Sequence, residues 1–267
     1  MINKIRFTIF SVLLCALSGC EKVVELDLRN DIGQLVIEGN INNLSERQTV
    51  RLSTNVSFSG GQSTDPVSGA EVTVSEGTQS DHIFRETTAG TYIADGFRGT
   101  PGRSYTLRVI NGGTTYTAVS VMPAVVELDS VSSRIDDFDI QGNDRQVSVH
   151  YRDPVDGPNQ YRFVFYIDGV MVRRPFVNND MLSNGRNVRF DLRLLSEDPE
   201  VRSGANVRVE MQCVDLPVYT YWFSLRQQGL NGAGGGVTPS NPPNNISPTA
   251  LGYFSAHTAQ IKSTTVR

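Results

Sequence analysis

The stretch at residues 207–213 reads Val207-Arg208-Val209-Glu210-Met211-Gln212-Cys213, with an apolar side chain at every second position. This alternation is typical of a β-strand with one face buried and the other in water. The same period recurs in Tyr105-Thr106-Leu107-Arg108-Val109 and Val147-Ser148-Val149-His150-Tyr151. The sequence therefore predicts an all-β protein with antiparallel sheets, in which Cys213 is a buried, inert thiol.

Turn sequences that tolerate positive φ separate the predicted strands. They are Asp168-Gly169, Asn111-Gly112-Gly113 and Asn184-Gly185. Asparagine, aspartate and glycine adopt the left-handed conformation that tight hairpins require. We expect a hairpin at each of them, and the first should join strands at residues 160–167 and 170–177.

The predicted strands form two groups that meet near Pro123, where a proline lacks the N–H that a sheet ladder needs. Residues 29–123 are predicted to form one β-sandwich, and residues 124–267 a second β-rich domain. In residues 66–74 the first group resembles the immunoglobulin-like or transthyretin-like modules of bacterial surface proteins. The predicted architecture is thus two β-sandwich-like domains with one short helix in the second.

The predicted helix covers residues 216–227. Asp215 can cap it and Pro217 fits its first turn. Tyr219, Trp222 and Phe223 fall on one face, which we expect to be mostly core. Tyr221 lies about 100° from Trp222 around the helix and is the ring expected to be most exposed.

A Gly/Pro-rich loop at residues 229–245 follows the helix. Exposed aromatic rings can stack on a glycan or a peptide, and loops carry many binding contacts. The candidate contact residues for a ligand or partner are Tyr219, Tyr221, Trp222, Asn241 and Asn244.

Residues 1–19 have the layout of a secretory signal, with Lys4 and Arg6 ahead of an apolar run. Leu17-Ser18-Gly19-Cys20 resembles a bacterial lipobox. On this resemblance the chain is cut before Cys20, which carries diacylglycerol and acyl chains such as palmitate, and residues 20–28 form a tether. The apolar run is shorter than the roughly 20 residues of a membrane-spanning helix. We therefore expect a lipid-anchored protein.

Charge and motifs exclude several classes of function. The chain has 24 basic and 28 acidic residues, a net charge of -4, which becomes -6 when Lys4 and Arg6 leave with the signal. A nucleic-acid partner would need clustered positive charge, so we expect none. His82, His150 and His257 are too far apart in sequence for a zinc motif, and we expect no metal site.

Four aspartates offer oxygen ligands for calcium, but solvated loop carboxylates are the better interpretation. They are Asp136, Asp137, Asp139 and Asp144. The sequence has no nucleophile elbow, phosphate loop or dinucleotide fingerprint. We expect no catalytic residues, no enzyme activity and no cofactor apart from the lipid on Cys20.

The order of motifs resembles a Bacteroidota lipoprotein family of unknown function, usually encoded beside TonB-dependent outer-membrane receptors. The segments that carry the resemblance are the lipobox, residues 35–39, residues 67–72, Tyr219-Thr220-Tyr221-Trp222, residues 241–246 and Leu251-Gly252-Tyr253-Phe254. The resemblance implies a location and a partner, and it brings no catalytic residues.

The leading hypothesis is a non-enzymatic outer-membrane lipoprotein, accessory to a TonB-dependent transporter. It would bind the receptor barrel, a glycan or peptide substrate, or both. We expect it at the cell surface, with the periplasmic face as the alternative location. The alternative function is a structural or adhesive cell-surface protein, and an enzyme ranks third.

Overall fold

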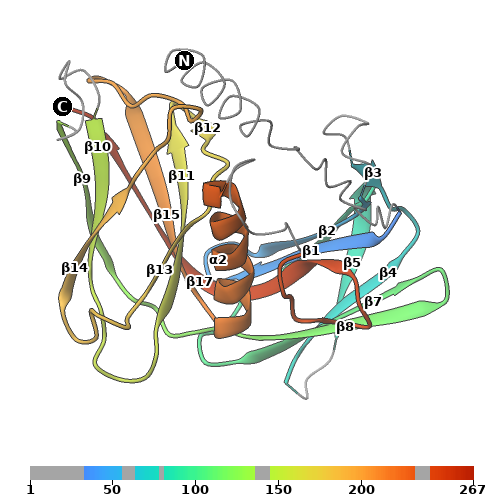
Figure 1. Ribbon diagram of the computed structural model, residues 1–267. Coiled ribbons are helices and arrows are strands. Elements are labelled where there is room, and N and C mark those ends of the chain that lie inside the picture. The colour runs from blue at the N-terminus through green and yellow to red at the C-terminus, as the bar shows by residue number, and fades with distance from the viewer. Residues whose placement is uncertain (1–32, 56–63, 78–80, 136–144, 232–240) are drawn as a thin grey trace, which may run out of the picture. The chain divides into compact units, whose positions relative to one another are not determined.

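The computed structural model describes residues 33–55, 64–77, 81–135, 145–231 and 241–267 (Figure 1). These residues form strands and one helix, which confirms the predicted all-β class. Cys20 with its tether, the candidate calcium ligands at 136–144 and residues 232–240 of the Gly/Pro-rich loop lie outside the described residues.

The first half of the chain contains eight of the strands. They are β1 (Leu35–Asn42), β2 (Arg47–Thr54), β3 (Asp65–Pro66), β4 (Glu71–Glu76), β5 (His82–Thr88), β6 (Thr91–Asp95), β7 (Ser104–Asn111) and β8 (Thr114–Val121). In β1 buried and half-buried side chains alternate without a break, as the sequence pattern predicts.

The second half contains the remaining strands and the helix. They are β9 (Leu128–Ile135), β10 (Arg145–Arg152), β11 (Gln160–Ile167), β12 (Val170–Met171), β13 (Phe176–Asn179), β14 (Asn187–Leu192), β15 (Asn206–Val214), α2 (Leu216–Asn231), β16 (Ile246–Ser247) and β17 (Leu251–Thr265).

Hydrogen bonding connects most strands into one continuous sheet of 14 strands. Its path runs β12-β11-β15-β17-β1-β2-β6-β5-β4-β7-β8-β16, with β3 and β13 attached at the side. A separate sheet of three strands has the order β14-β10-β9. The small sheet and the β11–β15 part of the large sheet enclose the second core.

Strand β17 belongs to both halves of the fold. Its first part pairs in parallel with β1, and its second part pairs antiparallel with β15 from Thr258 onward. A strand of 15 residues is about 50 Å long, enough to cross both cores. Close approach to β1 requires glycine at 252, because a Cβ there would collide with the carbonyl oxygen of Ile37.

Two hydrophobic clusters reflect the two groups of strands. The first contains side chains of β1–β8 together with Ile246, Phe254 and Ala256 from the end of the chain. The second extends from Val126 to Cys213 and includes Val266. Along the chain the predicted boundary at Pro123 lies between the clusters, while the last strands return to the first one.

One prediction about a strand and one about a turn are wrong. The strand predicted at 170–177 is split into β12 and β13, because Pro175 interrupts the ladder that pairs both segments with β11. The turn at Asn184-Gly185 does not join a hairpin, since β13 and β14 lie in different sheets. The hairpin at Asp168-Gly169 is confirmed, with φ of 48° and 84°.

Candidate functional site

Helix α2 begins where the sequence predicts. The Asp215 carboxylate accepts a hydrogen bond from the Val218 amide at 3.2 Å and so caps the helix. The other carboxylate oxygen accepts hydrogen bonds from the Ser120 hydroxyl at 2.7 Å and the Val121 amide at 3.0 Å. Burial raises the pKa of Asp215 above its usual value, although these hydrogen bonds oppose the shift. One side chain thus fixes α2 to the end of β8.

The aromatic residues of α2 pack against the sheet. Tyr221 and Trp222 both contact the Tyr253 ring, with centroid distances of 5.1 and 5.0 Å. The expectation that Tyr221 is the most exposed ring is wrong, because Tyr253 fills the space beside it. Phe223 is exposed instead, at 37%. The Tyr219 hydroxyl accepts a hydrogen bond from the Asn179 amide at 3.1 Å.

Polar groups lie beneath the helix. The Arg162 guanidinium is 3.8 Å from the centroid of the Trp222 ring and donates to the Gln212 side chain at 2.9 Å. His257 is buried, 3.0 Å from the Ser255 hydroxyl. Desolvation, and then the nearby charge of Arg162, lower the pKa of His257 to about 3, so the imidazole is neutral at physiological pH.

The two asparagines chosen as candidate contacts have different surroundings. Asn244 donates to the Ala250 carbonyl at 2.7 Å and accepts from the Ile246 amide at 3.0 Å, so it holds its own loop together. Asn241 is exposed. The structure brings Tyr219, Tyr221 and Trp222 together in a cluster with Val214, Val218 and Tyr253, and neither asparagine belongs to it. A binding role for these residues stays a prediction.

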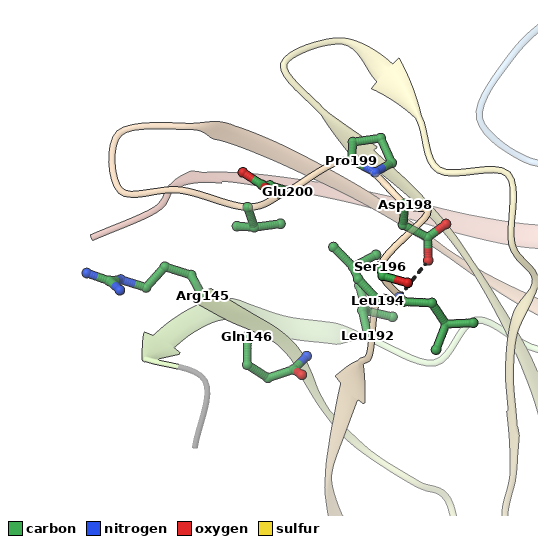
Figure 2. A pocket seen from close by; sticks show the side chains of 10 residues that line it. Arg145, Gln146, Leu192, Leu194, Ser196, Asp198, Pro199 and Glu200 are labelled. Atoms are coloured by element: carbon green, nitrogen blue, oxygen red, sulfur yellow. Dashed lines mark hydrogen bonds between the residues drawn. The ribbon is translucent and has the colours of Figure 1, made fainter. Parts of the chain in front are cut away.

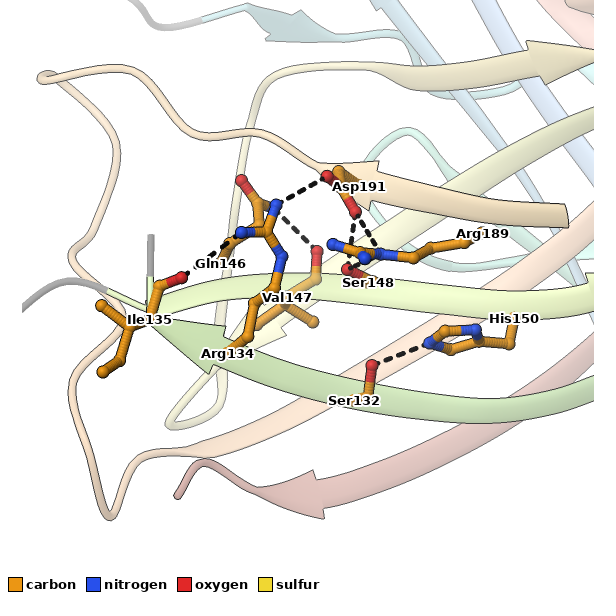
Figure 3. Close-up of polar contacts among 9 residues, drawn as sticks. All are labelled: Ser132, Arg134, Ile135, Gln146, Val147, Ser148, His150, Arg189 and Asp191. Atoms are coloured by element: carbon orange, nitrogen blue, oxygen red, sulfur yellow. Dashed lines mark hydrogen bonds and ion pairs between the residues drawn. The ribbon is translucent and has the colours of Figure 1, made fainter. Parts of the chain in front are cut away.

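The outer face of the three-stranded sheet carries a polar array (Figure 3). Asp191 accepts hydrogen bonds from the Ser148 hydroxyl at 2.6 Å and Arg189 at 3.1 Å, and Arg134 lies 3.3 Å away. Partial burial alone would raise the pKa of Asp191, but the Ser148 hydroxyl and the two guanidinium groups hold it below its usual value. Ser132 and His150 form a second pair at 2.8 Å.

A hollow of about 330 Å³ lies between the start of β10 and the loop that follows β14 (Figure 2). Its wall combines the side chains of Leu192 and Leu194 with Arg145, Gln146 and Glu200. Asp198 lines it too and accepts a hydrogen bond from the Leu195 amide at 2.9 Å, which fixes the loop. The volume is near the lower end of the range for small-molecule sites.

A second hollow, of about 200 Å³, shares Leu195 with the first. We call it the basic hollow because three arginines, Arg174, Arg193 and Arg226, line it. Its wall also includes Phe176 and Phe190. The sequence analysis did not predict this hollow. The sequence pattern that could have indicated it is the pair Arg173-Arg174 ahead of Pro175.

Two neighbouring loops, residues 153–159 and 180–186, expose large apolar side chains. Val155 is 69% exposed, Met181 79% and Leu182 88%. We call these three residues the apolar tip. Exposed apolar residues are common one at a time, but a group on adjacent loops is typical of a contact surface. Met181-Leu182 within the polar run 178–184 was the signal in the sequence.

Hydrogen bonds hold the two loops side by side. The Asn159 amide donates to the Asp180 carboxylate at 2.8 Å, and the Asp180 amide donates to the Asn159 carbonyl at 3.1 Å. The Gly185 amide donates to the Pro154 carbonyl at 3.2 Å. The apolar tip therefore rests on a fixed backbone.

The described ranges contain no group of three or more His, Cys, Asp or Glu side chains arranged to hold a metal ion. Cys213 is a free, buried cysteine, as predicted. Burial raises the pKa of its thiol. No helix within the part that the structure describes is long and apolar enough to cross a membrane.

Residues 21–263 match the family described as "Domain of unknown function (DUF4249)". No curated protein matches the chain. Among solved structures, the adhesin InvE of Yersinia pseudotuberculosis is similar at 17% identity, over 69% of this chain and 57% of that one. Its TM-score is 0.21, and so poor a superposition supports no conclusion about function.

Proposed function

The chain belongs to the DUF4249 family, whose function is unknown, and on this premise we propose that it is a non-enzymatic, lipid-anchored binding protein of the bacterial outer membrane. The Leu17-Ser18-Gly19-Cys20 sequence supports the lipid anchor, since its cysteine stands directly after small residues and an apolar run. Two or more acyl chains would hold the protein stably at a membrane. The anchored protein would then bind its partner at the membrane surface.

The proposed partner is the barrel of a TonB-dependent receptor, to which the protein is an accessory subunit. The resemblance of the motif order to lipoproteins that are usually encoded beside TonB-dependent receptors supports this choice. The observation that carries the proposal is the apolar tip, because its three side chains would leave water only in a complex. Apolar contacts at the centre of an interface, on a rigid backbone, provide affinity without a large ordering cost.

The test is co-purification from membranes in mild detergent. A Met181→Ser, Leu182→Ser double variant removes most of the apolar tip while leaving the loop hydrogen bonds in place. We expect the unaltered chain to retain an outer-membrane barrel and the double variant to lose it.

The matched control is Val119→Ser with Val121→Ser. These two valines are 52% and 47% exposed on β8, in the other half of the fold. The control should retain the barrel. The proposal fails if no barrel accompanies the unaltered chain, or if the apolar-tip variant retains as much barrel as the control.

Protease treatment of intact cells tests the proposed location. Digestion without lysis is the expected result for a protein at the cell surface. Protection until lysis would place the chain on the periplasmic face, and capture of an external substrate would then have to be abandoned.

A further inference from the structure

We propose that the basic hollow binds a small carboxylate that carries an apolar or aromatic group. The free acid and the C-terminal residue of a peptide share this chemistry. The biological meaning of this inference rests on the proposed binding role, but the binding can be measured on the purified chain.

The charge of the hollow is positive in a protein of net charge -4. Its arginines come from three elements: Arg174 from the link before β13, Arg193 from the loop after β14, and Arg226 from α2. Guanidinium groups remain charged at any physiological pH, so gathering them costs repulsion that an anion would relieve.

Two acidic groups, Asp191 and Asp198, offset part of this charge. Asp191 lines the hollow, but it already lies between Arg189 and Arg134 at 3.1 and 3.3 Å. Asp198 is 3.7 Å from Arg174 and accepts a hydrogen bond from the Leu195 amide. The lining of the hollow thus contains three arginines and one carboxylate, Asp191, so its formal charge is positive.

Two of the arginines are already positioned. Arg174 donates to the Arg193 carbonyl at 2.9 Å, and Arg226 donates to the Val177 carbonyl at 3.2 Å. Each bond uses one of the five N–H donors of a guanidinium, so donors remain for the two oxygens of a carboxylate. Fixing these side chains in advance lowers the entropic cost of binding.

The remaining wall favours an apolar group. The Phe190 ring stacks on Phe163 at 5.2 Å, and the Phe176 ring meets Phe165 edge-on at 6.1 Å. Both rings are thus anchored in the second core, and the half-buried Phe190 ring is the more accessible of the two. The volume of about 200 Å³ equals about six or seven water molecules, which suits a single side chain rather than a larger ligand.

The experiment is calorimetric titration of the full chain, purified in mild detergent, with N-acetylphenylalanine. We expect saturable binding that is about tenfold or more weaker for the C-terminal amide of the same compound, since the amide lacks the charge. Inorganic phosphate should also bind more weakly, because it has no apolar part. Equal binding of the amide or of phosphate would overturn the proposal.

Variants localise the binding. Arg226→Gln and Arg193→Gln should each weaken it about tenfold, and Arg226→Lys, which keeps the charge, should weaken it less. Arg208→Gln is the matched control, because Arg208 lies over the Tyr166 ring at another hollow, and it should bind normally. Equal thermal unfolding midpoints verify that each variant is folded. Unchanged binding in both glutamine variants would overturn the proposal.

A longer peptide ending in phenylalanine with a free carboxylate distinguishes the two sources of the ligand. Binding as tight as that of N-acetylphenylalanine identifies chain termini as ligands, whereas much weaker binding identifies free acids. If the unaltered chain binds none of these ligands but still co-purifies with a barrel, this inference alone is rejected. If the unaltered chain binds the ligand but no barrel co-purifies with it, the proposed partner alone is rejected.

Discussion

The first and second hydrophobic clusters are similar in size, with 20 and 18 buried residues, but the polar groups buried around them differ. In the first half, Gln48 is buried and its side chain donates to the carbonyl groups of Asn42 and Phe97. In the second half, Asp153 is buried with one oxygen bonded to the Tyr161 hydroxyl and the other without a partner among the described residues. The hollows and the apolar tip described above also lie in the second half.

This difference teaches how the fold divides its tasks. A core whose buried polar groups are all satisfied is a stable scaffold. Incompletely satisfied polar groups, hollows and exposed apolar side chains cost stability and are typical of functional regions. The first half thus acts mainly as the support, and the second half provides the candidate surfaces.

The largest expected effect tests how strongly the first cluster depends on the last strand of the chain. Phe254→Ala removes a fully buried ring that the last strand contributes to the first cluster. Truncation of a buried phenylalanine costs about 3–5 kcal/mol through lost burial and the cavity left behind. Chemical denaturation measures this loss. Phe223→Ala is the control, and a similar loss there would contradict the assignment of Phe254 to the core.

The second prediction concerns His257, which lies on the strand shared by both halves. Its folded-state pKa of about 3 is below that of the unfolded chain, so its contribution is complete above about pH 6.5 and is lost as pH falls toward 3. The expected loss at about pH 5 is roughly 2 kcal/mol.

The variant His257→Gln should remove this part of the pH dependence, as measured by denaturation at several pH values. His150→Gln is the control, because His150 lies on the outer face beside Ser132. If the two variants have the same pH profile, the buried imidazole is not the cause.

A smaller effect is expected on the outer face of the three-stranded sheet. Asp191→Asn should cost about 1 kcal/mol at neutral pH, because the carboxylate is partly exposed and solvent screens its two ion pairs. Its lowered pKa means that the contribution is present above the unfolded value and disappears as pH falls through the folded one. The variant and the unaltered chain should therefore converge in acid.

The control for this prediction is Asp95→Asn, which removes a more exposed pair with Arg47 in the first half. Its unfolding midpoint should hardly change. A larger loss for Asp95 than for Asp191 would reverse the ranking of the two ion pairs.

The smallest expected change sharpens the distinction between support and surface. The Met181→Ser, Leu182→Ser double variant should alter the free energy of unfolding by less than about 0.5 kcal/mol, because both side chains are already in water. Thermal unfolding measures it. A marked destabilisation would mean that the apolar tip belongs to the core.

Local sequence patterns predicted the positions of the strands and the helix better than they predicted which strands pair with one another. Alternation identified β15, and the Asp215 cap and Asp168-Gly169 turn follow from short-range chemistry. The pairing of β17 with β1 did not follow, because a period of two identifies a strand but not its neighbour. Tyr221 was misjudged because helical spacing gives the direction of a side chain and not the width of the surface that covers it.

The candidate surfaces depend on tertiary structure in the same way. Arg174, Arg193 and Arg226 are spread over about fifty residues and meet only after β13, β14 and α2 are assembled. The loops that carry Val155 and Met181 are joined by backbone hydrogen bonds. Sequence alone shows the residue types, but their convergence requires the sheet order.

Strand β17 also affects the order of folding. Asn40 and Tyr253 are 213 residues apart in sequence, yet their side chains are hydrogen-bonded at 3.3 Å. The ribosome synthesises the chain from its N-terminus, so the residues of β1–β8 emerge long before Phe254, which fills their core. Contacts over such separations form slowly, so the first sandwich stays open until the last strand has been made.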